Sequence, residues 1–311
     1  MSRYIIRRVF LLIPMLLIVI FIVSFIMALT PSNPGILILG ERADPAEIQK
    51  LNDELGYNDP FFVRYAKYVW NAAHGDLGKS WKNDNPVIVE ILRRLPTTVT
   101  LAVGSILIGL VVGLPLGVIS AVKQYSPLDI GGTVFAMILA SFPAFWIGMM
   151  LIILFSLKLG LLPSFGIGSI RHFILPWVTT SCAFIASQLR MTRTSMLEAI
   201  RMDYIRTARA KGQRERIVIM RHALRNALLP VVTILGMDFG SMLGGTVTIE
   251  TVFSLPGVGS LIIEAIRMKD IPVVVGATVT LATSYTLLML LVDILYAFID
   301  PRIKARYIKH S

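Results

Sequence analysis

Six apolar runs divide this chain, and each is long enough to cross a lipid bilayer as a helix. A bilayer has a hydrocarbon core about 30 Å thick, which takes about 20 helical residues to cross. With 55% hydrophobic and only 16% charged residues, the 311-residue chain is more apolar than a water-soluble domain. The pattern predicts a polytopic, all-α transmembrane six-helix bundle in contact with membrane lipid. Its spans are expected at residues 9–29, 98–122, 131–157, 173–189, 230–252 and 272–299.

The basic residues predict the orientation of the bundle. Residues 190–225 hold ten Lys or Arg and only three acidic residues, which favours the cytoplasmic side. Basic residues at 3–8 and at 302–309 place both termini on the same side. The loop at 31–96 then lies outside, where its nine acidic and eight basic residues balance. Because the net charge of +11 flanks apolar runs instead of forming a stripe on a soluble fold, no nucleic-acid partner is expected.

We expect the first apolar run to be an uncleaved anchor. It exceeds the apolar region of a signal peptide, and Thr30-Pro31 follows where a small-residue cleavage site would stand. The whole chain, 1–311, is therefore interpreted as a single transmembrane domain. It has an extracytoplasmic loop at 31–96 and a cytoplasmic coupling loop at 190–229.

Three short helices are predicted outside the spans. D-P-A-E at 44–47 is typical of a helix start, with Gly56 as the stop. A second helix is expected over 60–73. A third, over 260–268, should turn Leu261, Ile262 and Ile266 inward.

The coupling loop contains a compact helix that ends at a glycine, a form that another protein could grip. An explanation by topology alone accounts for Arg190 and Arg193 but not for this helix. The residues predicted to contact a partner are Asp203, Tyr204, Ile205, Arg206, Thr207, Ala208, Arg209, Ala210, Lys211 and Gly212.

Within the spans, two rows of glycines and a few polar or aromatic residues stand out. Glycines at four-residue spacing allow helix backbones to approach closely, and we interpret both rows as structural. Asp238 lies inside the fifth span, where a carboxylate is costly unless paired or hydrated, so either a pathway residue or a buried hydrogen bond is expected. The glycines are Gly109, Gly113, Gly117, Gly236, Gly240 and Gly244; the possible pathway residues are Asp238, Ser241, Met242, Phe142, Phe145 and Trp146.

Several kinds of chemistry find no support in the sequence. G-K-S at 78–80 ends like a P-loop, but Ala73 replaces the first glycine, so the chain should not hydrolyse ATP itself. The four histidines are scattered, and Cys182 is the single cysteine, so no metal site is expected. No enzymatic activity and no bound cofactor are predicted.

A series of short motifs resembles the membrane subunits of binding-protein-dependent ABC importers, in the dipeptide, oligopeptide and nickel branch. The resemblance covers nearly the whole chain. The motifs are R-Y-I-I-R-R at 3–8, H-G-D-L-G at 74–78, R-M-T-R-T-S-M at 190–196, D-Y-I-R-T-A-R-A-K-G at 203–212, H-A-L-R-N at 222–226, L-P-V-V at 229–232, L-P-G-V-G at 255–259 and D-P-R at 300–302.

The resemblance includes a departure from the general coupling motif E-A-A-x-x-x-G. Arg206, Thr207 and Ala208 stand at its first three positions, and Gly212 stands at its glycine. The glutamate is therefore absent, so a salt bridge through it is unavailable. These departures are typical of the peptide and nickel branch.

The resemblance implies a type I ABC importer fold in a prokaryotic inner membrane. It implies a second, related permease subunit, two cytoplasmic ATPase subunits that use ATP and Mg²⁺, and an extracytoplasmic substrate-binding protein. The pathway would run between the two permease subunits. Peptides are the expected substrate; nickel, nickel chelates and glutathione stay open. A stand-alone secondary carrier and a non-transporting scaffold or receptor are the alternatives from other classes.

Overall fold

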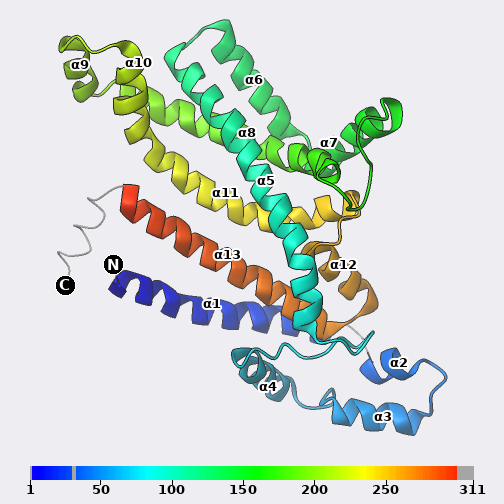
Figure 1. Ribbon diagram of the computed structural model, residues 1–311. Coiled ribbons are helices and arrows are strands. Elements are labelled where there is room, and N and C mark those ends of the chain that lie inside the picture. The colour runs from blue at the N-terminus through cyan, green and yellow to red at the C-terminus, as the bar shows by residue number, and fades with distance from the viewer. Residues whose placement is uncertain (1, 30–32, 300–311) are drawn as a thin grey trace. The chain divides into compact units, whose positions relative to one another are not determined.

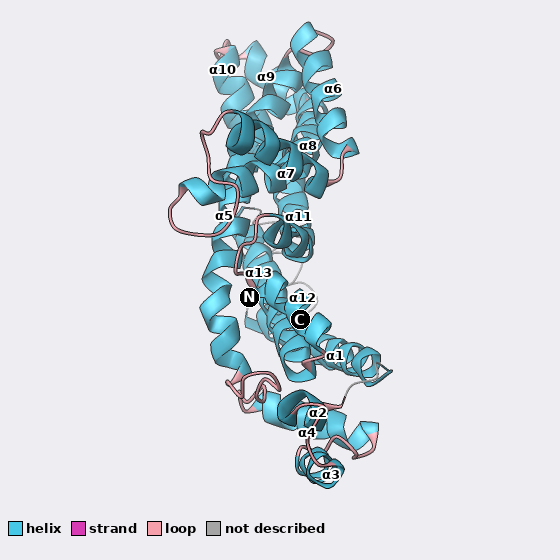
Figure 2. Cartoon of the chain, turned by 90° about the vertical axis from the view of Figure 1, so that its right-hand side faces the viewer, coloured by secondary structure: helices cyan, strands magenta, loops and turns pink. Residues whose placement is uncertain are grey.

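The computed structural model describes the backbone of residues 2–29 and 33–299. Within its helices, the side chains of 2–9, 241, 243–245 and 292–299 lie outside the described set. Apart from one isolated bridge between Lys79 and Pro86, the regular structure of the described part is helical (Figure 1, Figure 2). The predicted all-α class is confirmed. The terminal basic residues predicted to set the orientation lie outside the described side chains, so the sidedness of the chain stays a prediction.

Four described helices are long and apolar enough to cross a membrane, and they include the first, second, fifth and sixth predicted spans in whole or in part. Two of them begin well before their predicted spans, at Val87 and at Glu215, because the helical conformation starts in the residues that precede each span. The four segments are Phe10–Leu29, Val87–Val122, Glu215–Gly240 and Ile271–Leu291.

The predicted third span is broken by a bend of 99°. Helix α6 (Pro127–Ser141) ends before Pro143, and α7 (Ala144–Leu151) continues into the π-helical segment η1 (Ile152–Lys158). Phe142 between them is extended, with φ −92° and ψ 137°. A residue before proline is pushed out of the helical region by the proline ring, which explains why the helix breaks here. Counted together, this pair is a fifth candidate span.

The predicted fourth span lies inside α8 (Arg171–Ile200), which is one continuous helix but is not among the described helices apolar enough to count as a span. Its polar residues Ser181, Gln188 and Thr192 are fully buried. Polar residues on a helix face that packs against protein do not meet lipid, so that face does not need to be apolar. The count of six spans therefore stays a prediction.

Contacts divide the chain into two compact units, each with its own apolar core. The first unit comprises Met1–Thr98 and Pro256–Leu287. Its core joins short segments of the loop at 31–96 to the first turns of α13 (Ile271–Ile299), where Gly276 packs on Val87 and Leu77. Its helices are α1 (Ser2–Leu29), α2 (Pro34–Leu39), α3 (Pro45–Glu54), α4 (Phe61–Ala73), the start of α5 (Val87–Val122), α12 (Val258–Met268) and most of α13 (Ile271–Ile299).

The second unit comprises Val99–Leu255 and Leu288–Ser311. Helix α8 is its centre and packs against α6, α7 and α11. Besides these helices, the unit contains the rest of α5 and a group of short helices beside the start of α11, coloured yellow-green in Figure 1. They are α9 (Asp203–Ala210), α10 (Glu215–Ile217) and η2 (Val218–Ala223), followed by α11 (Leu224–Val252).

Helix α5 reaches α8 through its row of glycines. A Cβ atom on Gly113 would lie 3.0 Å from the Cβ of Gln188, and one on Gly117 would lie 2.6 Å from the Cβ of Thr192. A Cβ on Gly109 would collide with the ring of Phe184. Side chains at these three positions would therefore force the two helices apart.

The three predicted short helices are present. Asp44 caps α3 by accepting a hydrogen bond from Ala46 N at 2.9 Å, and α4 and α12 follow the predicted ranges within two residues. The inward face of α12 differs in one position: Ile266 is exposed, and Ala265 is buried in its place. The smaller residue faces the core because α13 turns back beside α12 through Lys269, which has a positive φ of 58°.

Candidate functional site

The predicted coupling helix is α9, a two-turn helix with one buried face. Ile205 and Ala208 are three residues apart, so both point to the same side, and both are buried. Gly212 follows the last turn with a φ of 73°, a left-handed conformation that a residue with a Cβ adopts only at a cost. Sequence and structure agree on where this helix begins and ends.

The buried face of α9 rests on an apolar cluster to which every neighbouring element contributes. The end of α5, the end of α8, η2 and the start of α11 each add small or medium apolar side chains. Because α9 packs into this shared cluster, a shift of α9 would disturb the packing of these ends. The cluster consists of Ala121, Met196, Ala199, Ile205, Ala208, Val218, Ile219, Ala223, Leu224 and Ala227.

Two polar contacts brace the far end of α9. Arg209 donates two hydrogen bonds to Glu215, from Nε at 3.1 Å and from Nη2 at 2.6 Å. These bonds raise the pKa of the Arg209 guanidinium above its usual value. Gln213 Oε1 lies 2.8 Å from His222 Nε2. The fixed helix thus presents an exposed face that carries Tyr204 and Arg206.

Arg206, which stands where the general importer motif has glutamate, is on that exposed face. Its guanidinium lies 3.6 Å from the Asp203 carboxylate one turn earlier, and both side chains are mostly exposed. An ion pair of this kind contributes little to stability, so both groups are available to a partner.

A second set of contacts, also in the second unit, surrounds the carboxylate of Asp129 in the first turn of α6. Arg193 of α8 donates to it from Nε at 2.6 Å and from Nη2 at 2.8 Å. Tyr125 N donates at 2.9 Å, and Ser120 Oγ of α5 also donates to it. The Asp129 side chain is 3% exposed and that of Arg193 is 26% exposed. We call Ser120, Tyr125, Asp129 and Arg193 the Asp129 clamp.

The clamp also holds the turn between α5 and α6. Tyr125 has a φ of 62°, which is uncommon for a residue other than glycine, although its side chain is 78% exposed and packs little. The hydrogen bond from Tyr125 N to Asp129 holds this conformation. Ser126 then caps α6 by accepting from Asp129 N at 3.3 Å. The carboxylate therefore joins α8 to the continuous segment that runs from the end of α5 to the start of α6.

The aromatic pathway residues gather at the break between α6 and α7. The rings of Phe142 and Trp146 stack with their centroids 4.5 Å apart. Both rings, and that of Phe145, are exposed in the single chain. An exposed aromatic group beside a helix break is available to lipid or to another subunit.

Asp238, for which the sequence predicted either a pathway role or a buried hydrogen bond, lies on α11 beside α8. Its Oδ2 atom is 3.5 Å from Gln188 Nε2, and the residue is partly exposed. Met242, one turn later, is buried, so it does not share the exposure of Asp238. On the same helix Gly236 is buried and Gly240 is partly exposed, whereas Ser241 and Gly244 lie outside the described side chains.

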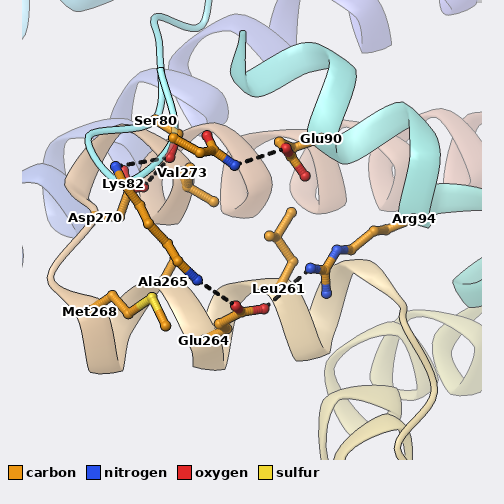
Figure 3. Close-up of a pocket in the computed structure, with 11 residues that line it drawn as sticks. Ser80, Lys82, Glu90, Arg94, Leu261, Glu264, Ala265, Met268, Asp270 and Val273 are labelled. Carbon is orange, nitrogen blue, oxygen red and sulfur yellow. Dashed lines mark hydrogen bonds and ion pairs between the residues drawn. The ribbon is translucent and has the colours of Figure 1, made fainter. Parts of the chain in front are cut away.

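The first unit contains a third polar group, drawn in Figure 3. Glu264 of α12 bridges two basic residues: Lys82 Nζ at 3.1 Å and Arg94 Nη2 at 3.2 Å. The hydrogen bond from Lys82, followed by the nearby charges of Lys82 and Arg94, holds the pKa of the Glu264 carboxyl below its usual value. Because the Glu264 side chain is 41% exposed, water screens these contacts.

Behind Glu264 the loop at 79–86 is fixed by two further carboxylates. Asp270 accepts from Ser80 Oγ at 2.5 Å and from Trp81 N at 3.2 Å, and Glu90 accepts from the amides of Asn83 and Asn85. The hollow that these residues line has a volume of about 50 Å³. It can hold a few water molecules but not a peptide. This network joins the loop to α12 and α13.

Sequence reasoning missed the Asp129 clamp and the Glu264 bridge. It explained Arg193 by membrane topology and did not single out Asp129. One feature of the sequence could have drawn attention to Asp129: its carboxylate lies just before an apolar span, close to Lys123 in a loop predicted to be cytoplasmic. The pairing itself depends on the fold, because 64 residues separate the partners.

Two family models match the chain. The model of the binding-protein-dependent transport system inner membrane component matches residues 113–305, and the model of the N-terminal part of this membrane component matches residues 1–102. The chain belongs to this family. It is a multi-pass inner membrane component of a transport system, and the predicted permease class is confirmed.

Curated relatives match this inner membrane component along almost its whole length. The dipeptide transport system permease protein DppB of Alkalihalophilus pseudofirmus is 39% identical over 332 residues, covering 98% of this chain and 100% of the relative. The glutathione transport system permease protein GsiC of Pectobacterium atrosepticum is 40% identical, covering 98% and 99%. A putative peptide transport system permease protein of Brucella abortus is also 40% identical, covering 98% and 99%.

The inner membrane component also shares its fold with a solved transporter. A chain of the MetNI methionine ABC transporter, in an inward facing conformation, superposes with a TM-score of 0.59. The match covers 68% of this chain and 97% of that chain at 19% sequence identity. The predicted type I importer permease fold is confirmed.

Proposed function

We propose that this inner membrane component is one of two membrane subunits of an ATP-driven importer for peptides. Relatives named for dipeptide and peptide transport, about 40% identical over nearly the full length, support this substrate class. A relative named for glutathione, itself a small peptide, makes glutathione the second candidate. Nickel and nickel chelates are the remaining candidates within the branch.

The observation that carries the proposed mechanism is the seating of α9. Its buried face rests on the ends of α5, α8 and α11, and its other face is exposed with Tyr204 and Arg206. A cytoplasmic ATPase that receives the exposed face in a cleft, and closes on binding ATP, would displace the seated helix ends with it. We infer that residues 203–212 couple ATP hydrolysis to the opening of the bundle by this mechanical contact.

The partners follow from the family. A binding-protein-dependent system needs an extracytoplasmic protein that delivers substrate and, in this proposal, two ATPase subunits that use ATP and Mg²⁺. The sequence of this chain contains no complete P-loop motif, so ATP would be bound by the partner subunits. A second, related membrane subunit completes the pathway between the two bundles.

Reconstitution tests the proposal. The membrane subunits, the ATPase subunits and the binding protein are placed in liposomes, and uptake of radiolabelled dipeptides, glutathione and nickel is measured with and without ATP. Uptake of a peptide only when all components and ATP are present supports the proposal. Uptake by this chain alone, driven by an ion gradient, would establish the stand-alone carrier instead, and no uptake by the complete system would favour a scaffold.

Gly212→Trp tests the docking of α9. No atom lies within 4 Å of a Cβ placed on Gly212, so the new side chain meets no neighbour in this chain, although the left-handed φ of 73° strains any residue that carries a Cβ. Gly40→Trp is the matched control, because Gly40 has a φ of 87° and also has no atom within 4 Å of its Cβ position. We expect Gly212→Trp to abolish ATP-driven uptake and Gly40→Trp to retain it. Normal uptake by the Gly212 variant would refute docking at this helix.

A further inference from the structure

Helix α6 is attached to the rest of the second unit by few buried groups. Asp129 and Ala136 are its two fully buried residues, and the apolar side chains of Leu128, Ile130 and Phe135 are exposed. The apolar attachment is a small cluster in which Ala136 meets α8 and α5; its members are Leu116, Ala136, Ala186 and Leu189. The polar attachment is the Asp129 clamp.

The Asp129 clamp includes residues from the ends of α5 and α8, which also contribute to the apolar cluster that seats α9. Ser120, which donates to Asp129, is next to Ala121 in the apolar cluster beneath α9. Arg193 precedes Met196 of that cluster by one helical turn on α8. The end of α5 thus contributes Ala121 to the apolar cluster that seats α9, and Ser120 to the carboxylate of α6.

The geometry of the clamp suits the transfer of movement. The planar guanidinium of Arg193 meets both carboxylate oxygens of Asp129, which fixes the angle as well as the distance between α6 and α8. Four donors surround the carboxylate, so α5, the turn before α6, α6 itself and α8 meet at one point. A buried joint with all its partners in place holds one arrangement instead of sliding.

From these contacts we propose that Asp129 and Arg193 are positioning residues for coupling: they make α6 move as one body with α9. A displacement of α9 then reaches the far end of α6, where the chain breaks at Phe142 and Pro143. The inference rests on the proposed coupling by α9, and it identifies the route by which that movement reaches the aromatic residues at the break.

Arg193→Lys in the complete reconstituted transporter tests this role. Lysine keeps the positive charge opposite Asp129, so the fold is retained, but it cannot form the two-point contact. We expect the number of substrate molecules imported per ATP hydrolysed to fall about fivefold or more, with the assembled complex present in normal amount. Arg64→Lys in α4, where Arg64 Nη1 donates to Tyr57 O at 3.3 Å, is the matched control and should leave the ratio unchanged.

A measurement of the distance between α6 and α10 tests the Asp129 clamp independently of uptake. Cys182 is replaced by alanine, and spin labels are attached through cysteines introduced at Leu128 on α6 and Ile217 on α10, both of which are exposed. We expect the distance between the labels to be the same with and without ATP when Arg193 is present. With Arg193→Lys the distance distribution should broaden or become dependent on ATP.

The two measurements separate the possible failures. A normal import ratio and an unchanged distance in Arg193→Lys would overturn the clamp inference while leaving the proposed function intact. Less assembled complex with a normal ratio would also overturn it, because the pair would then only stabilise the fold. Absence of ATP-driven uptake in the unsubstituted transporter would refute the proposed function, and the distance measurement would still decide whether α6 and α10 are joined.

Discussion

The Asp129 clamp in the second unit and the Glu264 bridge in the first unit use the same chemistry in opposite surroundings. Each is a carboxylate that accepts hydrogen bonds from basic side chains. Asp129 is 3% exposed and faces one planar guanidinium, whereas Glu264 is 41% exposed and divides its oxygens between a lysine and an arginine. The difference indicates that a buried carboxylate fixes geometry, while an exposed one adds a weak attraction that water screens.

The largest loss of stability is expected when the buried carboxylate of Asp129 is removed. Asp129→Ala leaves the partly buried Arg193 without its partner, and removing one member of a buried pair costs about 3–5 kcal/mol of folding free energy. The free energy of unfolding of the purified chain is measured by titration with SDS in mixed micelles. A loss below 1 kcal/mol would show that the pair behaves like a surface ion pair.

An intermediate loss of stability is expected when Ser120, which donates a hydrogen bond to Asp129, is substituted. Ser120→Ala removes one hydrogen bond to the charged Asp129 carboxylate but leaves the ion pair with Arg193. A hydrogen bond to a charged group contributes about 1.5–3 kcal/mol, so a loss near 1.5 kcal/mol is expected in the same titration. Ser141→Ala, where the hydroxyl donates to the Met137 carbonyl on an exposed face, is the control and should cost less.

A small effect is expected at the Glu264 bridge. Glu264→Gln keeps the size of the side chain and removes its charge, and exposed ion pairs contribute at most about 1 kcal/mol. The loss should shrink further in high salt, because salt screens exposed charges. A loss of several kcal/mol that does not depend on salt would place Glu264 in the same class as Asp129.

The smallest expected effect is the pH dependence of the same bridge. The hydrogen bond from Lys82 lowers the pKa of Glu264 in the folded protein. The bridge therefore contributes stability above the unfolded pKa of about 4.3, and the contribution is lost as pH falls through the lower folded value. The difference in unfolding free energy between the unsubstituted chain and Glu264→Gln should be constant from pH 7 to about pH 5.5 and fall towards zero below about pH 4. A difference that grows in acid would contradict the assigned direction.

Local features of this fold could be predicted from the sequence because they depend on neighbouring residues. The start of α3 follows from Asp44 and Pro45, the end of α9 follows from Gly212, and the break after α6 follows from Pro143. The four-residue spacing of Gly109, Gly113 and Gly117 predicted a close helix contact but not which helix would fill it. Only the fold identifies that helix as α8.

Long-range pairings could not be predicted. Arg193 was one of ten basic residues in its loop, and nothing local distinguishes it from Arg190. Glu264 meets Lys82 across 182 residues because α12 turns back beside the loop at 79–86. The fourth span stays a prediction for a related reason: the polar residues of α8 occupy buried positions that the sequence alone does not reveal.

The buried polar surface of α8 has a consequence for how the protein is made. A helix that carries Ser181, Gln188 and Thr192 at fully buried positions is a poor candidate for entering lipid by itself. Its polar groups are buried away from lipid only when the neighbouring helices are already present. Two of the helices that α8 contacts, α7 and α11, lie before and after it in the chain. Biogenesis of the second unit is therefore expected to be cooperative, with α8 retained beside its neighbours at the insertion machinery until α11 has been synthesised.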